Sequence, residues 1–192
     1  MRNIIFAVAL LFVSGVASAA PKLAANVKGM DFGFIAPNEF YPARSIEHLQ
    51  DIQEGLLISV GTERALMTAI LNKKITSILQ VDYDERVVRY NRVNLQLLKL
   101  SRDREDYLHL RMRADLDEWI ERATTAGRDI GFAKYFAWWH EALSNSRFYG
   151  FHTNWSTKSV VNVPFRGAHY LFDDSAYEYI HRFALEDRIQ IR

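Results

Sequence analysis

The residues of this chain that could do chemistry lie in one stretch, Leu56–Asn94. An apolar run, Leu56–Val60, ends at Gly61, and a second apolar run, Ile75–Val81, ends at Asp82. In dinucleotide-binding folds a glycine-rich turn follows the first strand, and an acid about 20 residues later binds the hydroxyls of a ribose. The 21 positions from Gly61 to Asp82 match that spacing. We therefore expect a βαβ unit that presents a turn glycine and an acid at the same edge of a sheet.

The turn itself argues against a dinucleotide. Glu63 and Leu66 occupy the second and third glycine positions of the dinucleotide motif. A carboxylate beside a pyrophosphate costs about 4 kcal/mol at roughly 4 Å in an intermediate dielectric, so NAD and FAD are unfavourable ligands. S-adenosylmethionine is cationic and carries no phosphate, so the same argument does not exclude it.

From about Gly55 to Arg111 the chain resembles an uncharacterised bacterial branch of the class I S-adenosylmethionine-dependent methyltransferase-like proteins, which have a Rossmann-like fold. The resemblance rests on two segments, "VGTER" and "VDYDERVVRYNRVNLQLLKLSRDREDYLHLR". It implies an α/β fold with a Rossmann-like, methyltransferase-type parallel sheet. It also implies an S-adenosylmethionine site, whose cofactor-binding positions here are Gly61, Thr62, Glu63, Asp82 and Asp84.

The match to the cofactor motif of that family is incomplete. In such methyltransferases the first strand and its turn read acid-x-Gly-x-Gly-x-Gly, and these positions are held here by Leu57, Ser59, Gly61 and Glu63. One glycine of three is present and the acid is absent, whereas Asp82 matches the acid that binds the ribose of the cofactor. The resemblance therefore supports the fold more strongly than the activity. It leaves the cofactor and any catalytic residues unknown.

Each polar residue of the stretch also has a structural interpretation. Asp84 is well placed to cap the helix that follows it, and Asp82 could face a ligand or serve the same turn. Asn91 and Asn94 fall on the apolar stripe of that helix, where an unsatisfied polar group costs about 1–3 kcal/mol. We expect them to bond backbone carbonyls of the Gly61 turn or of the following helix, with ligand contact as the alternative.

Hydrophobic periodicity and capping residues predict the other elements. Helices are expected at 46–54, 63–71, 84–100, 101–113, 115–123, 128–146 and 173–187, and strands at 56–60, 75–81, 159–163 and 188–192. Thr62 is placed to cap the helix after the turn, and Asp115 begins a capping-box pattern. Asp173 or Asp174 is expected to cap the last helix.

The order of these elements predicts an incomplete parallel sheet. Strands joined through helices form right-handed parallel crossovers, so the expected class is α/β with a large helical segment before the last strand. A methyltransferase sheet has seven strands with the first one central. Here the strand at Ile189–Arg192 is only the third, if the short segment 159–163 in the irregular region is left aside. The edge of the first strand would stay open, a liability that proteins normally cover. A partner, a second copy or an irregular segment could complete it, unless the chain is a shortened form.

The first residues have the layout of a secretory signal peptide. A short positive start is followed by an apolar core and small residues, which favours cleavage after Ala19. Residues 20–44, with several prolines and glycines, read as an extended lead-in, and 45–192 as one methyltransferase-like α/β domain. We therefore expect an exported protein, periplasmic or secreted. An uncleaved membrane anchor is the alternative.

Composition excludes several function classes. Without Arg2 the chain has 23 basic and 23 acidic residues and no basic cluster, so nothing favours nucleic acid or, after signal cleavage, a membrane surface. It has no cysteine, hence no disulfide, thiolate metal site or cysteine nucleophile. A small molecule or a protein is the expected partner, and a homo-oligomer could form through the open sheet edge.

The other candidate sites are weaker. His140 and Glu141 lack the second histidine of the zinc-protease pattern, and no serine lies in a G-x-S-x-G elbow. Nothing in the spacing sets a metal geometry for the remaining histidines and acids, which are His152, His169, Asp173, Asp174 and His181. We expect no metal site. An aromatic concentration is expected to be core, with a stacking surface as the alternative; it comprises Tyr135, Phe136, Trp138, Trp139, Phe148, Tyr149, Phe151 and Trp155.

Two functions follow from these patterns. The degenerate turn, the short sheet and the exported compartment favour a non-catalytic relative that is secreted for binding or structural work. The alternative is an S-adenosylmethionine-dependent methyltransferase or another small-molecule transferase, with Gly61 for backbone approach and Asp82 for hydroxyls. Its site would lie in the crevice at the carboxyl ends of the first two strands.

Overall fold

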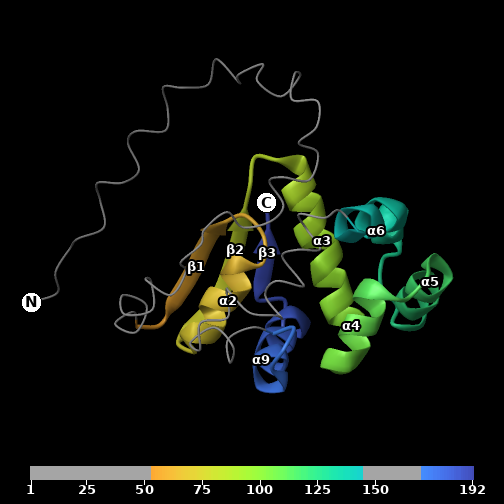
Figure 1. Ribbon diagram of the computed structural model, residues 1–192. Helices are drawn as coiled ribbons and strands as arrows, with labels where there is room; N and C mark the ends of the chain where they lie inside the picture. Colours follow the sequence, from red (N-terminus) through yellow and green to blue (C-terminus); the bar gives the residue numbers. More distant parts are fainter. Residues whose placement is uncertain (1–52, 145–169) are drawn as a thin grey trace, which may run out of the picture. The chain divides into compact units, whose positions relative to one another are not determined.

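The computed structural model describes residues 53–144 and 170–192 (Figure 1). All of these residues belong to one compact unit. The signal peptide, the lead-in and the strand predicted at 159–163 lie outside these residues, as does most of the helix predicted at 46–54. Within the described part of the chain, no helix has the length and apolar character needed to cross a membrane.

A three-stranded parallel sheet forms the centre of the fold. Its strands are β1 (Gly55–Val60), β2 (Ile75–Val81) and β3 (Ile189–Ile191), in the order β1-β2-β3. Ile58 pairs with Leu79, and Ile78 pairs with Ile189. The short apolar runs of the sequence thus form parallel strands, and all three strand predictions within the described residues are confirmed. A fully apolar run such as Leu56–Val60 is typical of a strand buried on both faces, but in β1 half-buried and exposed residues alternate. The class is α/β with a Rossmann-like layout.

The helices fall close to their predicted positions. They are α2 (Arg64–Leu71), α3 (Glu85–Leu100), α4 (Arg104–Met112), α5 (Leu116–Thr125), α6 (Phe136–Ser144) and α9 (Asp174–Leu185), with a 3₁₀ helix, η3 (Gly131–Tyr135), before α6. The single helix predicted at 128–146 is therefore wrong in its first half. The Asp129 side chain accepts the Gly131 amide, and such local bonds compete with α-helix formation.

Aspartates begin four of the helices. Their side chains accept a backbone amide of the first turn, which satisfies one of the unpaired N–H groups there; they are Asp84, Asp103, Asp115 and Asp173. The predicted caps at Asp84, Asp115 and Asp173 are confirmed. The predicted cap at Thr62 is wrong, because the N-cap position of α2 is Glu63, whose backbone is already helical.

The core lies on one face of the sheet. Both crossovers are parallel and advance in the same direction across the sheet, which places their helices on the same side (Figure 1). Ile78 and Ile189 are buried there against α2, α3 and α9. On β1 the alternate side chains Leu56, Ile58 and Val60 are exposed. The layout thus buries one face of the sheet and leaves apolar residues on the other.

Asp106 ties α4 to α5. Its carboxylate accepts bonds from the Arg122 guanidinium at 2.9 and 3.0 Å and from the Arg102 amide at 2.9 Å. Burial raises the pKa of Asp106, but the hydrogen bonds from Arg122 and Arg102 outweigh it and hold the pKa well below its usual range. The ionised carboxylate therefore stabilises the helical segment.

Asp106→Asn should lower the free energy of unfolding at neutral pH by about 1.5–3 kcal/mol, because hydrogen bonds to a charged group are lost. Since the folded pKa is lowered, this stabilisation is complete above the ordinary carboxyl pKa of about 4 and is lost as the pH falls through the folded value. Urea unfolding of both proteins from neutral to acid pH should show the difference shrinking below about pH 4. Glu121→Gln, an exposed acid on α5, should change stability by less than about 0.5 kcal/mol. A difference independent of pH would contradict this role.

Candidate functional site

The turn after β1 is held by side chains from β2 and α3. Gly61 has a φ of +96°, a conformation that glycine adopts without the strain of a side chain. Its carbonyl accepts the Asn91 side-chain amide at 2.9 Å, and the next carbonyl, of Thr62, accepts the amide of Gln80 at 2.7 Å. The prediction that Asn91 bonds the Gly61 turn is confirmed. Thr62 itself is buried.

Glu63 points away from the turn and into the core. Its Oε1 accepts the Tyr90 hydroxyl at 2.6 Å and the Nη2 of Arg111 at 2.6 Å. The side chains of Glu63 and Arg111 are each 1% exposed. A carboxylate held in this way does not line the surface of the turn. The repulsion of a pyrophosphate that the sequence predicts for Glu63 is therefore offset by the guanidinium beside it.

Arg111 joins this carboxylate to a second buried group, Asn94. Its Nη1 donates to the Asn94 carbonyl oxygen at 3.0 Å and to the Tyr107 hydroxyl at 2.6 Å. The Tyr107 hydroxyl also donates to Asn94, whose amide donates to Tyr170 at 3.3 Å. The prediction that Asn94 bonds a backbone carbonyl is thus wrong. Its side chain is instead bonded to the side chains of Tyr107 and Arg111 on α4 and of Tyr170.

Aromatic rings enclose the guanidinium. Arg111 lies 5.4 Å from the ring centre of Trp139, which stacks on Tyr90 at 4.8 Å. The indole of Trp139 donates to the Arg111 carbonyl at 3.0 Å. These contacts fit a cation–π arrangement in a desolvated setting. We call Glu63, Tyr90, Asn94, Tyr107, Arg111, Trp139 and Tyr170 the Glu63–Arg111 cluster.

Arg111 and the three tyrosines of the cluster keep their protons near neutral pH. Burial alone would lower the pKa of Arg111, but the Glu63 carboxylate outweighs this effect and raises the pKa. Burial also raises the pKa of Tyr90, Tyr107 and Tyr170. General acid–base catalysis works best when the pKa lies near the operating pH. The chemistry of the cluster is therefore that of a structural ion pair with neutral phenols.

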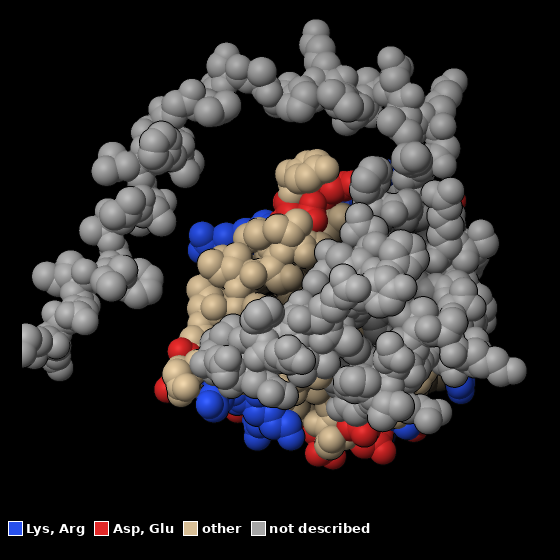
Figure 2. All heavy atoms as spheres, turned by 60° about the vertical axis from the view of Figure 1, so that its left-hand side comes forward, with Lys and Arg blue, Asp and Glu red and all other residues tan. Residues whose placement is uncertain are grey.

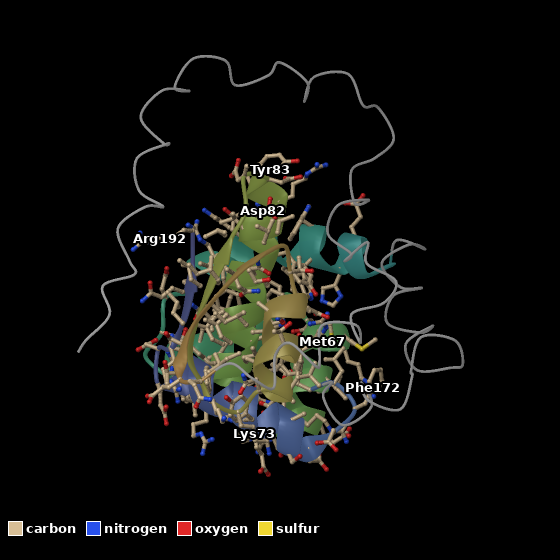
Figure 3. The ribbon with its side chains drawn as sticks, turned by 90° about the vertical axis from the view of Figure 1, so that its left-hand side faces the viewer. Met67, Lys73, Asp82, Tyr83, Phe172 and Arg192 are labelled. Carbon is tan, nitrogen blue, oxygen red and sulfur yellow. The ribbon has the colours of Figure 1, made fainter. Side chains whose placement is uncertain are left out.

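The acids after β2 lie at the carboxyl edge of the sheet, beside the glycine turn. Val60 and Val81 are paired, so Gly61 and Asp82 end neighbouring strands. Asp82 Oδ1 accepts the Asp84 amide at 2.9 Å, and Asp82 is half-buried. Tyr83, between the two acids, is 95% exposed at the tip of this edge (Figure 3). The structure therefore brings Gly61 and Asp82 together, as their spacing predicts.

Asp84 is occupied by the chain itself. It accepts the Arg86 amide at 2.9 Å and pairs with the Arg86 guanidinium at 2.7 Å. The side-chain hydrogen bond from Arg86 lowers the pKa of Asp84. Of the predicted cofactor positions, Gly61 and Asp82 thus face the edge, Thr62 and Glu63 are buried, and Asp84 caps α3.

The sequence reasoning missed Arg111, Tyr90 and Gln80. One signal could have found Arg111: it follows Tyr107 by four residues and so shares the apolar face of α4. An arginine on a buried stripe needs a carboxylate or several acceptors, because a buried charge without a partner is very costly. Glu63, an acid at the start of the apolar helix segment 63–71, was a candidate for that carboxylate.

The other candidate sites do not converge. Within residues 53–144 and 170–192, no group of three or more histidines and acids could hold a metal ion; His152 and His169 lie outside this range. His140 packs on Phe136 and Trp119, and burial lowers its pKa. Trp139 is fully buried, as expected of core. The remaining aromatics past Ser144 lie outside the described residues.

One open groove of about 670 Å³ lies beside α5. Four of its eight lining residues are acidic, three of them on α5 and the fourth its capping residue Asp115; the others include Leu100 and Arg122. None of the predicted site residues belongs to it. The groove is thus separate from the carboxyl edge of the sheet.

Comparison with known proteins gives a family. Residues 34–192 match the family model DUF7790, described as a domain of unknown function. The chain belongs to this family. No curated protein matches this chain in a sequence comparison. The DUF7790 match spans the whole sheet and every residue of the Glu63–Arg111 cluster, so this cluster belongs to the domain itself.

Gly61→Ala should destabilise the protein by about 1–2 kcal/mol, because the positive φ is strained for a residue with a Cβ atom. A Cβ at Gly61 would meet no atom within 4 Å, so steric clash does not contribute. Gly55→Ala is the matched control: its Cβ also meets nothing, and its φ is not positive. Thermal unfolding should show the loss for Gly61 and none for Gly55. Equal effects would contradict the importance of the backbone conformation.

Arg111→Met should destabilise by about 3–5 kcal/mol, because it leaves the Glu63 carboxylate buried without its cation. Adding Glu63→Gln to this variant should recover part of the loss, since the uncompensated charge is then removed. Denaturant unfolding of the two single variants and the double variant measures the coupling. Glu85→Gln, which breaks the exposed Arg89–Glu85 pair, should cost less than about 1 kcal/mol. Strictly additive costs would show that Glu63 and Arg111 do not stabilise each other.

Proposed function

We propose that this DUF7790 protein is an exported, non-catalytic relative of the methyltransferase-like Rossmann proteins, which works by binding or as a structural component. The observation that carries the proposal is the buried pair of Glu63 and Arg111. In a cofactor-binding turn the position of Glu63 holds a glycine. Here that position supplies a core ion pair instead.

The other groups of the turn support the same function. A cofactor needs a turn that backbone and ligand can approach together, which is why such turns are rich in glycine. The carbonyls of Gly61 and Thr62 already accept Asn91 and Gln80. The turn is thus fixed by the chain itself and needs no ligand to order it.

The expected compartment supports the proposal independently. The start of the chain has the layout of a signal peptide, with cleavage favoured after Ala19. S-adenosylmethionine and nicotinamide cofactors are cytosolic molecules, so an exported enzyme would meet little of either. A binding or structural role requires no such supply.

A small-molecule transferase is the second candidate, and one observation favours it. Gly61 has no atom within 4 Å of its Cβ position, and Asp82 is half-exposed beside it. A ligand could approach the turn backbone at Gly61 and place hydroxyls on Asp82. Asp84 and Glu63 would take no part in this site, since both are held by arginines.

A thermal-shift experiment separates the two candidates. The protein is expressed as the full chain, and its processed form is purified. An intact mass equal to that of a chain that begins at Ala20 would identify the exported species. It is then heated with S-adenosylmethionine, S-adenosylhomocysteine or adenosine. A ligand at 100 times its dissociation constant stabilises a protein by about 2.7 kcal/mol. We expect no shift with any of the three.

Variants make the outcome specific. A shift that is lost in Asp82→Ala and kept in Asp117→Ala, an exposed acid on α5, would contradict the non-catalytic proposal and favour the transferase. A methyltransferase with an intact glycine motif serves as the positive control for the ligands.

A further inference from the structure

We propose that this protein forms a two-fold symmetric dimer through β1. In this dimer the β1 strands of two copies pair antiparallel, so that two three-stranded sheets become one continuous sheet. The proposal goes beyond the function above and does not depend on it.

The first argument is the composition of the edge. Among the described residues only β2 pairs with β1. Exposed edge strands normally carry a lysine, a proline or an inward charge that prevents pairing with other chains. Gly55–Val60 reads GLLISV and has none of these. The strand thus lacks the residues that would keep a second strand away.

The second argument is a self-complementary apolar stripe. Leu56, Ile58 and Val60 point to the uncovered face and are 54%, 61% and 67% exposed. A two-fold axis at Ile58 places this residue opposite its own copy and Leu56 opposite Val60 of the other chain. Such directly opposed apolar pairs stabilise antiparallel strands. A single surface can therefore serve both subunits, as two-fold symmetry requires.

The stripe continues onto β2. Ile58 pairs with Leu79 and Val60 with Val81, and both β2 residues are half-buried. Figure 2 shows uncharged residues over this part of the molecule. An apolar surface that extends over two strands marks an interaction site more strongly than single exposed residues do.

The test uses the absence of cysteine from the chain. In the proposed dimer Ile58 faces Ile58, with Cα atoms about 4.5–5.5 Å apart, within the range of a disulfide. Ile58→Cys, purified and mildly oxidised, should run as a covalent dimer on non-reducing gels. Ile130→Cys is the matched control: Ile130 is also an exposed isoleucine, outside the sheet, and should stay largely uncrosslinked.

Charge variants test the same axis without oxidation. Sedimentation velocity is run from about 1 to 200 μM, a range that covers micromolar dissociation constants. The wild type should approach twice the chain mass at the higher concentrations. Ile58→Lys and Ile58→Glu should each stay monomeric, with an unchanged circular dichroism spectrum. An equimolar mixture of the two should recover the dimer.

Three results would overturn the proposal. One is a monomeric wild type throughout the concentration range; slow amide exchange in β1 would then show that another segment of the same chain covers the strand. A second is a dimer that survives both Ile58 charge variants. The third is crosslinking of Ile58→Cys no faster than that of Ile130→Cys.

Discussion

The buried ion pair between Glu63 and Arg111 is the interaction on which the rest of this fold depends. It joins the turn after β1 to α4, and through Asn94 and Tyr107 it reaches α3 as well. Removing two charges from water is expensive, and the cost is recovered only when geometry and further hydrogen bonds are good. The phenols, Asn94 and the ring of Trp139 provide that setting. In a chain without cysteine, the Glu63–Arg111 cluster thus links the turn after β1 to α3 and α4.

The same ion pair makes the turn of this βαβ unit different from a ligand-binding turn. A Rossmann-like turn has to leave its backbone open to a ligand, whereas this one is held by Asn91 and Gln80 and begins its helix with an inward carboxylate. Gly61 and Asp82 still lie side by side at the carboxyl edge of neighbouring strands. The turn glycine and the acid of a βαβ unit therefore lie together, while Glu63 and Asp84 bond to arginines of the chain itself.

Topology explains why the molecule has an apolar face. Crossovers of one hand that advance in one direction place every connecting helix on the same side of the sheet. In the described residues nothing pairs with the outer edge of β1, and its alternate side chains remain exposed. A sheet of this kind gains stability when another strand pairs with its edge, because the free N–H and C=O groups are then bonded and the apolar side chains of the stripe gain cross-strand neighbours.

The sequence by itself determined the elements and their order. Short apolar runs, a turn glycine and capping aspartates are local signals, so β1, β2, α3, α9 and the parallel sheet could be predicted from them. The 3₁₀ helix before α6 was not predicted, because the periodicity of 128–146 indicates one helix and does not show that the Asp129 side chain accepts the Gly131 amide. Only the tertiary structure decided the role of Glu63: Arg111 lies 48 residues away, and a carboxylate at a turn faces a ligand or the core according to whether a buried cation is brought beside it. Asn94 was decided in the same way, since its partners come from α4 and from Tyr170, which no local pattern places there.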